Sequence, residues 1–138
     1  MTRIVAVGMV RNEADIVEAF VRHTLRFADE LRLVDHLSTD RTPQILATLQ
    51  AEGLNVLVKR HTCQAQIQEI LTTTLAKEAF SGGADWVIPL DCDEFIDAPS
   101  PSRLRDDLAK IAKGSIAWWP WVSMVPHPAD DRSLIDPV

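Results

Sequence analysis

The chain has 138 residues, of which 46% are hydrophobic and 25% charged, and its formal net charge is -6. This length allows one compact domain, and the composition is that of a soluble globular protein rather than a disordered or membrane-spanning one. The acidic balance disfavours a nucleic-acid polymer as partner, because clustered Lys and Arg hold phosphate backbones. A small phosphorylated ligand can still bind through a metal ion.

The amino terminus predicts a buried first strand rather than a leader sequence. The apolar run Ile4–Val10 is short and charged residues follow it directly, which is unlike a signal peptide. We therefore expect a cytoplasmic protein without a transmembrane segment. Cys63 and Cys92 have no zinc-like spacing, so in that compartment they are expected to be free thiols.

Strand and helix patterns alternate along the rest of the chain. The predicted helices carry apolar residues three and four apart, and the predicted strands are apolar runs that end in polar clusters. Thr42-Pro43 predicts the start of a helix and Gly53 its end. In the next helix a stripe of Ile67, Ile70, Leu71 and Leu75 is expected to be buried. The predicted strands are 4–10, 31–34, 55–58, 86–90 and one within 116–125; the helices are 14–27, one starting at 42, 64–80 and one starting at 100.

This alternation predicts the α/β class, with a mostly parallel open sheet and helices on both faces. In such sheets ligands bind beyond the carboxyl ends of the strands. Three polar clusters fall at predicted strand ends, and we expect them to meet on one rim. They are Arg11-Asn12-Glu13, Asp35 and Asp91-Cys92-Asp93.

The last of these clusters predicts a divalent cation site. In an extended backbone Asp91 and Asp93 would point to one face, about 6.6 Å apart, and Cys92 to the other. Glu94 and Asp97 add negative charge, and crowded carboxylates either raise one another's pKa or recruit a counter-charge. The plainer alternative is a solvated strand end or a helix-capping group.

Three segments together resemble the family-2 type of nucleotide-sugar glycosyltransferase with a GT-A fold. The last looks like the DXD signature of that family, and in order and spacing the three span residues 10–95. They are Val10-Arg11-Asn12-Glu13, Val34-Asp35-His36-Leu37-Ser38-Thr39-Asp40-Arg41-Thr42 and Leu90-Asp91-Cys92-Asp93-Glu94-Phe95.

The resemblance implies a Rossmann-like GT-A nucleotide-binding half over residues 1–125, followed by an irregular tail at 126–138 that leads to an acceptor-binding half. Asp35 and the corner from Arg11 to Glu13 would contact the base and ribose of a nucleoside diphosphate sugar. Asp91 would reach the ribose or a metal-bound water, and Asp93 would ligate Mg²⁺ or Mn²⁺. An acceptor hydroxyl would then attack the anomeric carbon, with a catalytic base expected beyond residue 138.

Some residues of these segments also have structural interpretations. Asp35 and Asp40 are typical of turns, and Asp40 could satisfy free amides at the start of the next helix. Glu13 could serve a ligand or simply complement a helix amino terminus. Arg41 stands where the family pattern usually has glycine, which raises the question of whether that turn keeps its conformation.

Other polar and aromatic residues are weaker candidates. Gln64 and Gln66 could contact a donor, whereas His23 and His36 are expected to pack or hydrogen-bond structurally. His61 and His127 are expected in loops without zinc spacing. Trp118, Trp119 and Trp121 are expected mainly in the core, with one ring facing outward.

Two other functions compete with the glycosyltransferase hypothesis. A non-catalytic nucleotide-binding or assembly module fits the short length. A phosphatase with Asp91 as nucleophile and Asp93 as acid fits the paired carboxylates, but such a nucleophile is expected on an early strand. Apolar surface left on the sheet would favour self-association, which is a further hypothesis.

Overall fold

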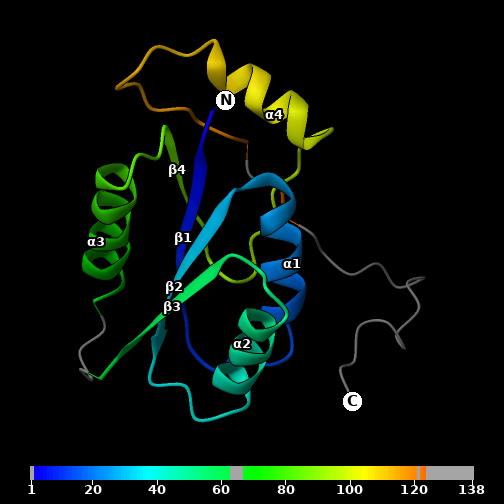
Figure 1. Ribbon diagram of the computed structural model, residues 1–138, viewed down its shortest axis with the longest axis vertical. Coiled ribbons are helices and arrows are strands. Elements are labelled where there is room, and N and C mark those ends of the chain that lie inside the picture. The colour runs from blue at the N-terminus through cyan, green and yellow to red at the C-terminus, as the bar shows by residue number, and fades with distance from the viewer. Residues whose placement is uncertain (1, 63–66, 121, 124–138) are drawn as a thin grey trace.

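In the computed structural model, which describes residues 2–62, 67–120 and 122–123, four parallel strands form one open sheet with the order β3-β2-β1-β4 (Figure 1). The predicted α/β class and parallel pairing are confirmed. The strands are β1 (Ile4–Val10), β2 (Glu30–His36), β3 (Val56–His61) and β4 (Trp86–Pro89). The helices are α1 (Val17–Phe27), α2 (Thr42–Ala51), α3 (Gln68–Ser81) and α4 (Pro101–Ala109).

Helices cover both faces of the sheet because β1 is apolar on both of its faces. Ile4 and Ala6 belong to the larger core cluster, which includes Phe20 of α1 and Leu46 of α2. The alternate residues of β1 face α3 and form a second, smaller cluster with Leu75 and Ala79. In Figure 1, α3 accordingly lies on one side of the sheet, with α1 and α2 on the other.

The helix α3 buries a narrower stripe than predicted. Leu75 and Ala79 are buried and Leu71 packs beside them, which places the contact line at every fourth residue. Ile70 is 62% exposed, so the prediction that it lies in the buried stripe is wrong.

Other predicted boundaries move where tertiary contacts extend or interrupt the local pattern. The strand β2 runs on to His36 because Asp35 pairs with Val10 of β1 and His36 pairs with His61 of β3. His61 therefore ends a strand, and its predicted place in a loop is wrong. The strand predicted within 116–125 is also wrong for residues 116–120 and 122–123, which form no strand; the others in that range lie outside the described residues.

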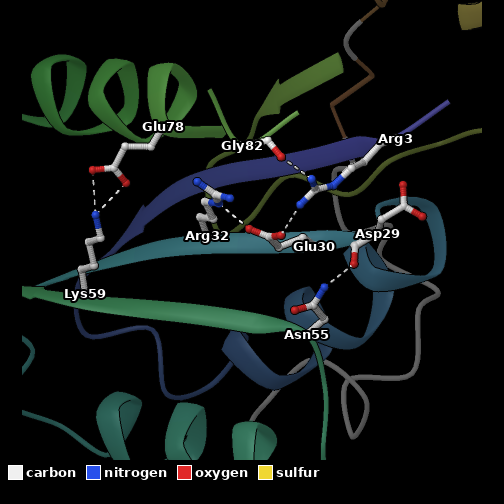
Figure 2. A network of polar contacts seen from close by, with 8 residues as sticks. All are labelled: Arg3, Asp29, Glu30, Arg32, Asn55, Lys59, Glu78 and Gly82. Carbon is white, nitrogen blue, oxygen red and sulfur yellow. Dashed lines mark hydrogen bonds and ion pairs between the residues drawn. The ribbon is translucent and has the colours of Figure 1, made fainter. Parts of the chain in front are cut away.

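The amino ends of the strands are joined by paired charges, which Figure 2 shows. Arg3 and Arg32 both form ion pairs with Glu30, whose side chain is only 9% exposed. The guanidinium of Arg3 also donates to the carbonyl of Gly82 at the end of α3, and Arg105 of α4 pairs with Asp29. These contacts fasten two helices to one end of the sheet.

No helix in the described part of the chain is long and apolar enough to cross a membrane. Cys92 is a buried free thiol, as predicted, and Cys63 lies outside the described residues.

Candidate functional site

The sheet has a topological switch point between β1 and β4. From β1 the chain proceeds outward to β2 and β3, and it then returns to the other side of β1 to form β4. The loops that leave the carboxyl ends of β1 and β4 therefore diverge, and a crevice between such loops is where open α/β sheets bind ligands. Two of the three predicted polar clusters follow these two strands.

The loop after β1 is held by side chains from the loop after β2. The backbone amide of Asn12 donates to Ser38 Oγ over 3.0 Å, and that of Glu13 donates to Thr42 Oγ1 over 2.8 Å. In return, Asn12 Oδ1 accepts from the amide of Thr39 at 2.8 Å. Asn12 has a φ of 56°, a left-handed conformation that asparagine tolerates better than most residues.

Asp40 connects the same two loops and caps a helix, as its structural interpretation predicted. Its Oδ1 accepts from the amide of Thr42 at the start of α2, and its Oδ2 accepts from the amide of Ala14. Desolvation alone would raise the pKa of Asp40, but these hydrogen bonds hold it below the ordinary value. Arg41 has a φ of -81°, so the arginine at the family's usual glycine position leaves this turn unstrained.

Because the amides of residues 12, 13 and 14 are all taken by side chains, this corner offers no free run of amides to an anion. A phosphate bound here would need a metal ion or a cationic side chain instead. Arg11 is exposed at the same corner and forms no ion pair with any described residue.

Asp35, at the end of β2, is buried beneath this corner with 2% of its surface exposed. One carboxylate oxygen accepts from the amide of Ser38 at 3.1 Å, and the other lies 4.0 Å from Arg60 Nε. Its nearest contacts thus hold the loop after β2. Its predicted contact with a nucleotide stays a prediction.

After β4 the chain turns at Asp91–Glu94, which we call the acidic turn. The amide of Glu94 donates to the carbonyl of Asp91 at 3.0 Å, and the carboxylate of Glu94 accepts from the amide of Asp91 at 2.9 Å. The premise of an extended backbone through Asp91 and Asp93 is therefore wrong. Cys92 belongs to the larger core cluster, and there burial and nearby carboxylates such as Glu13 raise the pKa of its thiol to about 12.

The three acids of the turn have different surroundings. Asp91 is held by Gln68 of α3, whose amide nitrogen donates to Asp91 Oδ1 over 2.7 Å. The carboxylate of Glu94 is occupied by the backbone amide of Asp91 in the same turn. Asp93 is exposed, and none of the described residues forms a hydrogen bond or ion pair with its carboxylate. Asp93 is thus the acid of this turn that is most open to a ligand.

The charges of the acidic turn act on Glu13 in the loop after β1, residues 11–14, which we call the β1 corner. Partial burial, followed by the charges of Asp15, Asp93, Asp40 and Asp91, raises the pKa of Glu13 above its ordinary value. Within the described residues no Lys, Arg or His forms an ion pair with Glu13, Asp91 or Asp93. The structure therefore brings two of the predicted clusters together as a group of uncompensated carboxylates at the switch point.

A hollow of about 390 Å³ opens beside the turn, on the side of α3. Its walls come from the first turns of α3 and from the exit of β4, and they include the hydrogen-bonded pair of Gln68 and Asp91. The complete lining is Gln68, Glu69, Thr72, Pro89, Leu90, Asp91 and Glu94. The polar part of this lining consists of one amide, one hydroxyl and three carboxyl groups.

Comparisons with known proteins give a fold relative and no family assignment. No protein-family model matches the chain, and no curated protein sequence does. A solved structure of similar fold is the mannosyltransferase PcManGT from Pyrobaculum calidifontis, in complex with GDP-Man and Mn²⁺. The match has a TM-score of 0.58 and 21% identity over 70% of this chain. This chain spans only 29% of the length of that mannosyltransferase.

The carboxylates suit a hard cation without enclosing one. No three His, Cys, Asp or Glu side chains of the described residues are grouped closely enough to form a complete metal cage. Mn²⁺ and Mg²⁺ prefer oxygen ligands, and Mg²⁺ in particular is commonly held by one or two carboxylates together with water and substrate phosphates. The open, uncompensated acids at the switch point fit that mode of binding.

Several contacts at the site were not predicted from the sequence. The sequence pattern does not distinguish Gln68 from other polar residues, although Gln68 stands at the start of the helix that precedes the acidic turn. Thr42 was expected only to start a helix, yet its hydroxyl also holds Glu13. Gln64 and Gln66 lie outside the described residues.

The described segment that follows α4, which includes Trp118 and Trp119, lies away from this site. Trp118 and Trp119 are 89% and 49% exposed, so the expectation that they are mainly core residues is wrong, and Trp121 lies outside the described residues. In Figure 1 the orange segment that follows α4 crosses the amino-terminal end of the sheet, opposite to the acidic turn.

Proposed function

We propose that this chain is the donor-binding part of a metal-dependent glycosyltransferase of the GT-A type, which uses a nucleoside diphosphate sugar and transfers the sugar to an acceptor hydroxyl. The observation that carries the proposal is the group of uncompensated carboxylates at the switch point between β1 and β4. The proposal is also supported by the similarity in fold to a mannosyltransferase whose structure was solved with GDP-Man and Mn²⁺.

In this proposal Asp93 ligates Mn²⁺ or Mg²⁺, because it is the exposed acid without a partner among the described residues. The metal, when bound, would offset the charge of the departing diphosphate. Asp91, held by Gln68, would orient the ribose or a metal-bound water. Arg11 and Glu13 of the loop after β1, together with Asp35, would contact the base and ribose of the nucleotide.

Thermal unfolding with nucleotide and metal tests the proposal. GDP or UDP together with Mn²⁺ at about 100 times the dissociation constant should add about 2.7 kcal/mol of stability, because a ligand that binds only the folded state stabilises it. For a chain of this size that corresponds to a rise in Tm of about 5 to 15 °C.

The variant Asp93→Ala should lose this metal-dependent rise while remaining folded. Asp106→Ala is the matched control, because Asp106 is an exposed aspartate on α4, away from the acidic turn. The absence of any shift in the unmodified chain with either nucleotide and Mn²⁺ would contradict a donor site. An unchanged shift in Asp93→Ala would move the metal-binding role to another residue.

A non-catalytic nucleotide-binding module is the second candidate. Both candidates predict the thermal shift, so turnover distinguishes them. Release of nucleoside diphosphate from a nucleotide sugar in the presence of Mn²⁺ would favour the enzyme. Hydrolysis of a phosphomonoester that disappears in Asp91→Asn would instead favour the phosphatase hypothesis.

A further inference from the structure

We propose that Phe20 and His23 of α1 form a seat that positions the acidic turn, acting through Phe95 and Ile96 directly after it. The significance of this seat for metal binding rests on the proposed function. The seat itself is a claim about the ligand-free chain. Phe20 and His23 are therefore assigned as positioning residues rather than as ligands.

The seat consists of two side chains three residues apart on one face of α1. The ring of Phe95 meets that of Phe20 at a centroid distance of 6.5 Å and an interplanar angle of 85°. It meets the ring of His23 at 5.2 Å and 71°. Both are edge-to-face arrangements, which favour aromatic pairs beyond the burial of their area.

A hydrogen bond fixes the same segment. His23 Nε2 lies 2.9 Å from the carbonyl oxygen of Ile96, so the imidazole N–H donates to the backbone just past the turn. The prediction that His23 has a structural role is confirmed by this contact. Phe20 is completely buried, which gives the seat a rigid base.

The turn is thus held at both of its ends. At its entrance the amide of Leu90 donates to the carbonyl of Val7 at 2.9 Å, which ties it to β1. At the exit of the turn, the side chain of Phe95 is 42% exposed. Its ring is held in place by the aromatic contacts with Phe20 and His23. Between these ends lie three carboxylates whose like charges oppose a compact turn, so the contacts at the exit add to those that Gln68 and Glu94 make within it. A turn that is already in place costs less ordering when a cation binds.

Phe95→Ala and His23→Ala remove the two parts of the seat, and His23→Gln keeps an amide donor for the carbonyl of Ile96. Phe80→Ala is the matched control, because Phe80 is a 55% exposed aromatic on α3. The first readout is hydrogen exchange of the amides of residues 91–97 in the metal-free chain. The second is Mn²⁺ affinity in the presence of GDP, measured by electron paramagnetic resonance.

We expect Phe95→Ala and His23→Ala to accelerate exchange in the acidic turn and to weaken Mn²⁺ binding about fivefold to tenfold, the size expected for one lost aromatic contact. His23→Gln should recover part of both effects, and Phe80→Ala should change neither. Because Phe95 is half exposed, its truncation leaves the core intact.

Exchange rates in both alanine variants that equal those of the unmodified chain would overturn the seat. Faster exchange with unchanged Mn²⁺ affinity would overturn its role in metal binding. If the unmodified chain bound no Mn²⁺ with any nucleoside diphosphate, the proposed function would fail, and the exchange rates alone would then uphold or overturn the seat.

Discussion

The two ends of the parallel sheet differ in whether their carboxylates are paired with cationic side chains. At the amino ends Glu30 lies between Arg3 and Arg32, and Asp29 is paired with Arg105. At the carboxyl ends the charges of Asp91 and Asp93 act on Glu13, and no cation of the described residues forms an ion pair with any of the three. One end is neutralised within the chain, whereas the other is left to be neutralised by something else.

The pKa values of the carboxyl groups shift in opposite directions at the two ends of the sheet. Burial alone would raise the pKa of Asp29, but Arg105 and the amide of Ile4 hold it below its ordinary value. Burial also raises the pKa of Glu13, and there the neighbouring charges raise it further. The paired end therefore stabilises the fold at neutral pH and the unpaired end opposes it. Uncompensated repulsion of this kind is common where a protein binds a ligand.

The largest expected effect on stability is at the paired end. Glu30→Ala leaves Arg3 and Arg32 without their shared carboxylate, and the side chain of Arg32 is only 14% exposed. We expect the free energy of unfolding to fall by about 2 to 3 kcal/mol, because an arginine that is partly buried loses its partner. Denaturation in urea measures the change, and metal-dependent nucleotide binding should survive it.

Glu78→Ala is the matched control for Glu30→Ala. It removes a glutamate whose partner is Lys59, and both of these side chains are well exposed (Figure 2). Exposed pairs contribute about 1 kcal/mol at most, so the loss should be smaller. Equal losses in the two variants would remove the distinction between a network that fastens the sheet and an ordinary surface pair.

The next largest effect concerns both stability and binding, and it is expected at Gly8 of β1, whose backbone lies close to that of Leu90. A Cβ atom added to Gly8 would lie 2.5 Å from the carbonyl oxygen of Leu90, the residue directly before the acidic turn. Gly8→Ala should therefore displace the turn and cost about 1 to 3 kcal/mol, as overpacking typically does. It should also weaken metal-dependent nucleotide binding, which isothermal titration would measure.

Gly82→Ala provides the comparison for Gly8→Ala. At Gly82 an added Cβ would meet nothing closer than 3.3 Å, and this residue lies at the end of α3, away from the carboxyl ends of the strands. It should have a small effect on stability and none on binding. If Gly8→Ala bound nucleotide and metal like the unmodified chain, β1 would not control the position of the turn.

The fold was predictable from the sequence where the pattern is local. The apolar run of β1, the start of α2 at Thr42 and the capping role of Asp40 all follow from adjacent residues. The parallel sheet follows from the alternation of elements. The strand predicted within 116–125 had a suitable composition, but a strand also needs a neighbour, and residues 116–120 pair with none.

The geometry of the site was less predictable because it depends on residues far apart in the chain. The order of elements brought Glu13 to Asp93, but the bend of the acidic turn depends on the capping of Asp91 by Glu94 and on the seat of Phe95. Asp91 and Asp93 would point to one face only if the strand continued through them. The strand β4 already ends at Pro89, which cannot donate a backbone hydrogen bond to a neighbouring strand. The contact of Gln68 with Asp91 likewise required the packing of α3.

The smallest expected effect is a pH dependence at the unpaired end. The pKa of Glu13 in the folded chain is raised above its unfolded value of 4.5, so its stabilising contribution is present below that pH and is lost as pH rises through the folded pKa. Glu13→Gln should thus stabilise the metal-free chain at pH 7, by less than about 1 kcal/mol because solvent screens an open site. At pH 4 it should have almost no effect.

Asp29→Asn tests the opposite sign at the paired end. The folded pKa of Asp29 is lowered from 3.8, so its contribution is present above that value and is lost as pH falls through the folded pKa. This variant should be less stable than the unmodified chain at pH 7, and the difference should shrink on acidification. Urea unfolding at pH 7 and at pH 4 or below, with a chelator present, measures both variants. A loss of stability at pH 7 in Glu13→Gln would mean that the acids at the carboxyl ends support the fold rather than strain it, and the contrast between the two ends would then disappear.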